Sequence, residues 1–305
     1  MTLISNFDVP VSQWGSPESS RFGIIVFHGM TEHIGRYAML GEWVVANGGC
    51  LIGADHLGHG ATHRGRLGDL GPDGWSALIN RNIRLVDAVM SAAPSIQWFI
   101  LGHSMGTFVA MDLVSKGRPG IKGLILTGGG YESKLRVGYG CIVATILGWI
   151  LGPAAKATLI YNLSYGEFNR PFKPTRTLFD WLSRKQSVVD SYIADPLCGF
   201  VPPVSYYQQV FGGIYRLFSR SFFRGFPRIP ILMMSGGNDS VTQNGRNCHR
   251  LAVRFKDAGK LDVQVSIFEG LRHVILDEID DEAVYATLGD WLARRGSDTV
   301  KVHST

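Results

Sequence analysis

The sequence predicts an α/β fold with a mostly parallel central sheet, flanked by helices and interrupted by an inserted, mainly helical cap. Continuous apolar runs of strand length alternate with longer segments of helical apolar spacing, which is typical of parallel sheets with helical crossovers. The alternation stops at residue 131 and resumes at residue 227, and connections between neighbouring strands are seldom that long. We therefore expect a core of residues 1–130 and 227–305, with residues 131–226 forming the cap.

The elements of the first core segment follow from its apolar runs and from the residues that end them. Residues 22–27 form a continuous apolar run, as expected for a strand buried on both faces of the sheet. Residues 47–49, Asn-Gly-Gly, end the first helix, and Pro94 ends the second. We expect strands within residues 3–11 and at residues 22–27, 50–54, 97–101 and 121–127, and helices at residues 34–46, 74–92 and 107–114.

The second core segment resumes the same alternation. We expect strands at residues 229–234 and 263–268, helices at residues 243–257 and 280–294, and a frayed tail at residues 297–305. A chain of 305 residues with 45% apolar composition can bury one large core and support a smaller appendage. One catalytic domain carrying one insertion is therefore the expected organisation.

Residues 102–106, Gly-His-Ser-Met-Gly, lie between an apolar run and a helical segment. In the order strand, turn, helix, this motif is typical of a nucleophile elbow, in which the serine occupies a strained turn. The two glycines let the strand and the helix approach closely, and the turn lifts the hydroxyl to where a substrate can reach it. We therefore expect Ser104 to be a nucleophile, although the motif by itself would indicate only a turn.

Two residues in loops after later strands are expected to activate Ser104. A serine hydroxyl needs a base to take its proton, and an acid must hold that base in one tautomer. In an open α/β sheet, chemistry collects beyond the carboxyl ends of the strands, where both Asp239 and His273 fall. The order Ser104, Asp239, His273 also occurs in known catalytic triads. Taken alone, Asp239 would be interpreted as a helix N-cap or Asx-turn, and His273 as a surface histidine. Asp195, in the cap, is the alternative candidate for the acid that orients the histidine.

Two backbone amides are expected to complete the site. Acyl transfer to a serine creates an oxyanion, which needs two preorganised N–H donors. One should be the N–H of Met105, directly after the nucleophile, and the other the N–H of Met30, in the loop after the first long strand.

The segment of residues 55–63 contains three histidines and suggests a metal site as an alternative. Gly58 and Gly60 argue against the regular helix that would align two ligands at positions i and i+4. We expect a structural loop near the active site instead, with no metal and no cofactor. The cysteines are far apart and lack a Cys-x-x-Cys pair, so we expect buried free thiols at Cys50, Cys141, Cys198 and Cys248.

Charge and hydropathy restrict the partners and the location. The net charge is +5 and the basic residues are scattered, so nucleic acid is not an expected partner. The first twenty residues contain neither Lys nor Arg and no long apolar run, so a cytoplasmic protein is expected. Residues 137–155 are uncharged but interrupted by glycines and a proline. We expect there a helix that covers a pocket and touches membranes, with a membrane span as the alternative.

Several motifs together resemble the monoacylglycerol lipase and lysophospholipase group of α/β-hydrolases, a set related to serine aminopeptidases. They are residues 28–33 (His-Gly-Met-Thr-Glu-His) with Arg36-Tyr37, residues 55–60 (Asp-His-Leu-Gly-His-Gly), residues 102–106, and the pair Asp239 and His273. Residues 189–198 resemble a cap segment of the same group. The resemblance extends from residue 21 to residue 291.

The resemblance implies an α/β-hydrolase fold and a cofactor-free serine hydrolase that cleaves carboxylic esters of a single acyl chain through an acyl-enzyme intermediate. A mobile apolar cap would admit a small-molecule or lipid ester and would touch the membrane transiently. The expected substrate-binding residues are Glu32, Ile142, Ile146, Trp149 and Leu197, with Ile150 and Phe200 beside them.

Three alternatives use the same fold. An aminopeptidase would need an acidic pocket for the substrate amine, whereas the cap composition is mainly apolar. A lactone or aromatic-ester hydrolase would suit the many aromatic residues of the cap. A non-enzymatic ligand-binding protein would be expected to have a broken triad.

Overall fold

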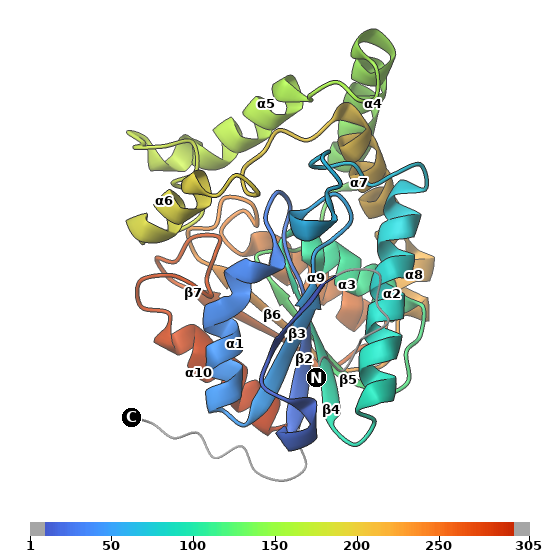
Figure 1. The fold of residues 1–305 in the computed structure, drawn as a ribbon, viewed down its shortest axis with the longest axis vertical. Coiled ribbons are helices and arrows are strands. Elements are labelled where there is room, and N and C mark those ends of the chain that lie inside the picture. Colours follow the sequence, from blue (N-terminus) through green and yellow to red (C-terminus); the bar gives the residue numbers. More distant parts are fainter. Residues whose placement is uncertain (1–9, 296–305) are drawn as a thin grey trace.

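The computed structural model describes residues 10–295 and contains a seven-stranded sheet in the order β1-β3-β2-β4-β5-β6-β7 (Figure 1). Strand β1 pairs with β3 in the antiparallel direction, and every other pair is parallel. The strands are β1 (Val11–Trp14), β2 (Phe22–Phe27), β3 (Gly49–Ala54), β4 (Gln97–His103), β5 (Ile121–Thr127), β6 (Ile231–Gly236) and β7 (Val263–Phe268). The prediction of a mostly parallel sheet is confirmed.

Helices cover both faces of the sheet, because successive side chains of a buried strand point to opposite faces. In β2, Ile25 and Phe27 belong to one apolar cluster, and Ile24 and Val26 belong to the other. The first cluster includes residues of α2 (Gly74–Ala92), α3 (Met105–Ser115) and α9 (Arg246–Asp257). The second includes residues of α1 (Ala38–Ala46) and α10 (Glu282–Ala293), which lie together on the other side in Figure 1.

Most predicted elements are present, with shifts at their ends. The first helix begins with a 3₁₀ turn at Ile34–Tyr37 before α1. Helix α9 begins at Arg246 and not at residue 243, because Gln243, Asn244 and Gly245 have positive φ angles that a helix cannot include. The first strand is Val11–Trp14, later than predicted, and both the rest of that prediction (residues 3–9) and the predicted tail (residues 297–305) lie outside the described residues.

Residues 131–226, which we call the cap, contain helices, most of which lie above the carboxyl ends of the parallel strands in Figure 1, whereas the last, α8, lies beside α2. The helices are α4 (Lys134–Leu151), α5 (Thr158–Asn169), α6 (Gln186–Ala194), α7 (Val204–Leu217) and α8 (Arg220–Gly225). Buried residues of α7 and α8 belong to the same apolar cluster as α2, α3 and α9. By contrast, Tyr165 of α5 and Tyr192 of α6 belong to a separate aromatic cluster.

Helix α4 is the one helix in the described part of the chain that is long and apolar enough to cross a membrane. It packs against α7, and only Val137 and Ala144 of its residues are buried. Its outer face carries large apolar side chains, including Leu135 at 87% exposure and Trp149 at 82%. One face of α4 therefore packs against the protein, and the opposite face exposes apolar side chains.

Candidate active site

The turn between β4 and α3 places Ser104 in a strained conformation. Its φ is 51° and its ψ is −119°, in a region that few residues other than glycine adopt. A Cβ on Gly102 would lie 2.3 Å from the carbonyl oxygen of Gly106, and a Cβ on Gly106 would lie 2.1 Å from that of Phe27. Both glycines are required because strand and helix backbones approach so closely. This is the geometry expected of a nucleophile elbow.

Asp239 and His273 are brought together from two separate loops. The Nδ1 atom of His273 lies 3.0 Å from Oδ2 of Asp239, and both side chains are buried. The other carboxylate oxygen of Asp239 accepts a hydrogen bond from the N–H of Val241 at 2.9 Å. The carboxylate thus fixes the orientation and tautomer of the imidazole, so that Nε2 is the nitrogen that can accept a proton.

The imidazole of His273 is held between two aromatic rings. Its ring centroid lies 4.9 Å from that of His103 and 5.0 Å from that of Trp181. His103 shares a hydrogen bond with Oγ1 of Thr127, and burial together with the neighbouring His273 lowers the pKa of His103 to about 4. A neutral His103 lets His273 gain a proton without repulsion from a second cation.

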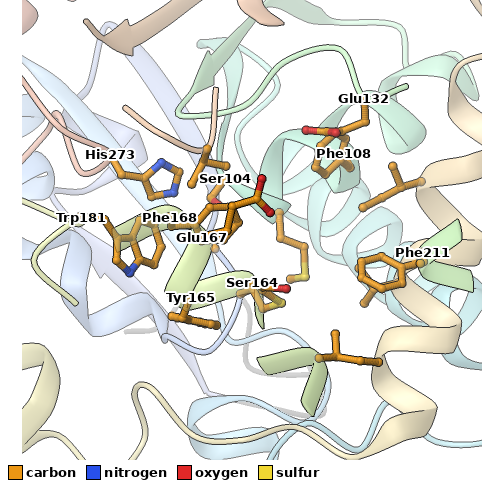
Figure 2. A pocket seen from close by; sticks show the side chains of 18 of the residues that line it. Ser104, Phe108, Glu132, Ser164, Tyr165, Glu167, Phe168, Trp181, Phe211 and His273 are labelled. Atoms are coloured by element: carbon orange, nitrogen blue, oxygen red, sulfur yellow. The ribbon is translucent and has the colours of Figure 1, made fainter. Parts of the chain in front are cut away.

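A cavity of about 340 Å³ contains Ser104 and His273 in its lining (Figure 2). Figure 2 shows the His273 ring at the side of the cavity where Ser104 lies. Met30 and Met105 also line it. Met105 is the first residue of α3, and the N–H groups in the first turn of a helix have no partners within the helix. Ser104, His273 and the two residues predicted for the oxyanion hole therefore line one cavity, while Asp239 is buried behind His273 and contacts it.

Most of the cavity wall is apolar and comes from the cap and from α3. Its apolar residues include Phe108, Val137, Val143, Ile160, Val210, Phe211 and Ile214. The polar residues Glu132, Arg136, Ser164 and Glu167 form a second group in the lining. A pocket of this kind suits a ligand with an apolar body and one polar end.

The sequence analysis missed the two carboxylates in this second group. Burial raises the pKa of Glu132 to about 7. The positive charge of Arg136 opposes this increase, and the negative charge of Glu167 adds to it. Glu167 pairs with Arg136 at 3.3 Å. No periodicity in the sequence distinguishes these glutamates from solvated ones, because Glu132 precedes α4 in a loop and Glu167 lies near the end of α5.

Glu32 lines the cavity as predicted, but its oxygens are occupied by protein donors. It accepts hydrogen bonds from the N–H of Gly29 at 2.5 Å, from Nε of Arg36 at 3.0 Å and from the hydroxyl of Tyr37 at 2.8 Å. Burial would raise its pKa, but His103, which is protonated at the low pH where Glu32 titrates, together with the charge of Arg36 and the Gly29 hydrogen bond, lowers the pKa to about 2. We assign Glu32 to holding the loop of residues 28–33.

The predicted acyl-binding residues of the cap lie outside the cavity, which corrects the prediction. Ile142, Ile146 and Trp149 are exposed on the outer face of α4, at 60%, 45% and 82%. Leu197 is half-buried in the loop after α6 and is not part of the cavity lining. The helix instead turns Val137, Gly140 and Val143 toward the cavity, at the three-residue spacing of one helical face.

The other residues that the sequence analysis weighed have structural partners. Asp195 bonds Nε2 of His33 at 2.7 Å, whereas Nδ1 of His273 pairs with Asp239, so Asp195 does not orient His273. In the loop of residues 55–63, Nδ1 of His59 bonds a carbonyl at 2.9 Å, and Nε2 of His56 bonds the carbonyl of His28 at 3.1 Å. All four cysteines are unpaired, and Cys141 is half-buried where a buried thiol was predicted.

A strained serine turn at the carboxyl edge of a mostly parallel sheet, beside a histidine held by an aspartate, is the architecture of the α/β-hydrolases, and the chain is an ester-hydrolysing enzyme of this class. Residues 18–280 match the family described as serine aminopeptidase, S33, and the chain belongs to that family. The finding agrees with the resemblance noted in the sequence.

Relatives and solved structures extend this assignment. The chain is 25% identical to human monoglyceride lipase over 92% of its own length and 86% of the relative's. It is 25% identical to phospholipase YtpA of Bacillus subtilis, over 86% and 91% of the two chains. Its fold is similar to that of a carboxyl esterase from Bacillus coagulans, with a TM-score of 0.80 at 22% identity over 94% and 96% of the two chains.

Proposed function

We propose that the protein is a serine hydrolase that cleaves carboxylic esters of a single acyl chain through an acyl-enzyme intermediate. The observation that carries the proposal is the shared cavity. Ser104 lies on a strained turn, His273 is held by Asp239 beside it, and both line one cavity whose wall is mainly apolar. Names of relatives such as monoglyceride lipase support the same substrate class.

The proposed chemistry follows from the positions of the side chains. Oγ of Ser104 attacks the ester carbonyl while Nε2 of His273 takes the hydroxyl proton, and Asp239 stabilises the imidazolium through Nδ1. The N–H groups of Met30 and Met105 bind the oxyanion that forms. His273 then gives its proton to the leaving alcohol. Water attacks the acyl-enzyme with His273 again as the base, which releases the fatty acid and restores the serine.

The substitution Ser104→Ala tests this mechanism. We expect turnover of a medium-chain p-nitrophenyl ester to fall by about 10⁴-fold or more, with an unchanged melting temperature, because the nucleophile is removed from an otherwise intact site. Ser115→Ala is the matched control, since Ser115 lies at the opposite end of the same helix. Turnover by Ser104→Ala at the rate of the control would remove Ser104 from the mechanism.

We also propose that the protein touches membranes peripherally through the outer face of α4. Leu135, Trp149 and Ile150 are each at least 70% exposed, and they belong to the helix that also lines the cavity. A lipid ester leaving a bilayer would thus meet the apolar face next to the cavity. Burying one large apolar side chain contributes about 1.5–3 kcal/mol, so a few such residues give reversible binding.

Co-sedimentation with phosphatidylcholine vesicles tests the membrane contact. The double substitution Trp149→Ser and Ile150→Ser should lower the partition coefficient by about 100-fold, since it removes two apolar side chains from the contact. Leu261→Ser is the control, because Leu261 is 79% exposed but lies in the loop before β7. Equal losses for both variants would contradict the assignment to α4.

A second candidate substrate class is favoured by Glu132 and Glu167. The cavity lining holds these two carboxylates against the one guanidinium of Arg136, which pairs with Glu167. This excess of carboxylate provides acidic surroundings for a substrate with a protonated amine, as in an aminopeptidase. Comparing kcat/KM for acyl glycerols and for aminoacyl amides separates the two classes. Under this second candidate, Glu167→Gln should lower kcat/KM for the amides about tenfold or more and leave that for the glycerol esters within a factor of about three.

A further inference from the structure

Thr31, the residue after Met30, has a backbone conformation that its side chain disfavours. Its φ is +53°, and it is fully buried. A β-branched residue at positive φ is an outlier that persists only where its surroundings enforce it. The contacts of Thr31 should therefore identify what enforces the conformation.

Three groups from the cap bond to Thr31. Its Oγ1 lies 2.8 Å from the hydroxyl of Tyr165 in α5 and 2.9 Å from that of Tyr192 in α6. Its carbonyl oxygen accepts hydrogen bonds from the Tyr192 hydroxyl at 2.9 Å and from the N–H of Gly199 at 2.9 Å. Each hydroxyl carries one proton, and one consistent arrangement has Tyr192 donating to the carbonyl, Tyr165 to Oγ1, and Thr31 to the carbonyl of Met30 at 2.8 Å.

The same loop is held on its other side by the core. Glu32 bonds the N–H of Gly29 and the side chains of Arg36 and Tyr37, as described above. The guanidinium of Arg36 also lies 4.9 Å from the ring centroid of Tyr192, so the core and cap attachments meet at that tyrosine. Met30 lies between the two attachments, and its N–H is the proposed second donor to the oxyanion.

We propose that Tyr165, Tyr192 and Gly199 hold Thr31 in its strained conformation and thereby place the N–H of Met30 in the oxyanion hole. These are positioning residues, and the inference rests on the proposed serine-hydrolase function. When α5 and α6 move away from the core, Thr31 loses these hydrogen bonds and relaxes, and the Met30 donor is displaced. The oxyanion hole is then complete only when this part of the cap is docked, so hydrolysis is confined to the closed enzyme.

The substitution Tyr192→Phe tests the inference. Loss of a whole oxyanion donor typically lowers kcat by 10²–10³-fold, so we expect a decrease of about 10- to 100-fold for a displaced one, with KM within about threefold. A boronic acid that forms a tetrahedral adduct with Ser104 should bind more weakly by a similar factor. A non-hydrolysable ether analogue, which has no oxyanion, should bind as it does to the unchanged enzyme. A purely structural role for Tyr192 would not separate these two ligands.

Tyr207→Phe is the matched control. Tyr207 is also a buried tyrosine of the cap, in α7, but its hydroxyl has no hydrogen-bond partner among the described residues. It should keep kcat within about threefold. Thr31→Val and Thr31→Ser cover the case in which Tyr192→Phe fails to fold, because valine removes the hydroxyl at constant shape and serine keeps it. Valine should reproduce the decrease in kcat, and serine should restore most of it.

In the arrangement above, Thr31→Val removes the hydrogen bond from Tyr165, and Tyr192→Phe removes the hydrogen bond to the Thr31 carbonyl. Both release the same conformation of Thr31, so the double variant should be slower than either single variant by less than the product of the two decreases. An unchanged kcat and an unchanged boronate affinity for Tyr192→Phe and Thr31→Val would overturn the inference while leaving the function intact. Activity retained by Ser104→Ala would instead remove the function on which the inference rests. The two failures are thus distinguishable.

Discussion

The close approach of α3 to β2 at Gly106 makes a strong prediction about the variant Gly106→Ala. A Cβ there would lie 2.1 Å from the carbonyl oxygen of Phe27, a backbone atom that cannot rotate away. Real Cβ contacts are essentially never below 3.0 Å, so the separation must increase by about 0.9 Å (3.0 minus 2.1). Because Ser104 and Met105 lie on the same turn, this shift moves the proposed nucleophile and one proposed oxyanion donor together.

A misplacement of about 1 Å can lower the rate of an enzyme by about 100-fold, and overpacking costs about 1–3 kcal/mol. We therefore expect kcat/KM of Gly106→Ala to fall by about 100-fold and its melting temperature by a few degrees. Ester hydrolysis and differential scanning calorimetry measure the two effects. Gly212→Ala in α7 is the control: its Cβ would meet nothing within 4 Å, so it should keep its activity and gain helix stability. A Gly106→Ala enzyme within threefold of the control would refute the reasoning.

Three further variants probe the charges around the cavity. Asp239→Asn should lower kcat by about 10⁴-fold at an unchanged melting temperature, as measured by ester hydrolysis, because an amide stabilises the wrong tautomer of His273. Glu32→Gln should lower kcat more than tenfold. The lowered pKa of Glu32 stabilises the folded protein above about pH 4.5, and this stabilisation is lost as pH falls to about 2. In an acid titration, the difference in stability between Glu32→Gln and the parent should therefore mostly disappear toward pH 2. The pKa of Glu132 is raised to about 7, so the contribution of its protonated form to the stability of the fold is lost as pH rises from about 4.5 to 7. The melting temperature of Glu132→Gln should therefore exceed that of the parent at pH 8, and the two melting temperatures should converge toward pH 4.5.

Much of the core was predictable because burial on both faces leaves a simple pattern. Residues 263–268 and 74–92 were predicted with the bounds that the structure has, since a turn signal or a proline ends each of them. The start of α9 was not, because Gln243 and Asn244 adopt left-handed conformations in a loop that is closed by a hydrogen bond from the N–H of Asn244 to the carbonyl of Asp239. Asn244-Gly245 is a turn signal, and the predicted helix start at residue 243 overlooked it.

The candidate triad was predictable for a related reason. Parallel strands deliver their carboxyl ends to one edge of the sheet, so a serine, an aspartate and a histidine in three such loops must converge. Glu132 follows β5 at the same distance in sequence as His273 follows β7, so the same rule could have found it. Glu167 follows no such rule, because its approach to the cavity depends on how the cap helices pack. The attachment of Thr31 to Tyr192 spans 161 residues, and no local pattern announces it.

Helix α4 shows why an apolar pattern can identify an element and still misplace its faces. Almost every side chain of this helix is apolar, so hydropathy alone could not separate the face toward the cavity from the face toward solvent. The small residues carry the missing information. Gly140, Ala144 and Gly148 are spaced by four, and the two glycines lie against Phe211 and Gln208 of α7. Small side chains let one helix approach another, so this stripe marks the packed face and leaves the large residues opposite it outside. The bulky side chains that were predicted to bind the acyl chain are therefore on the outer face, because the small residues occupy the face that packs against α7.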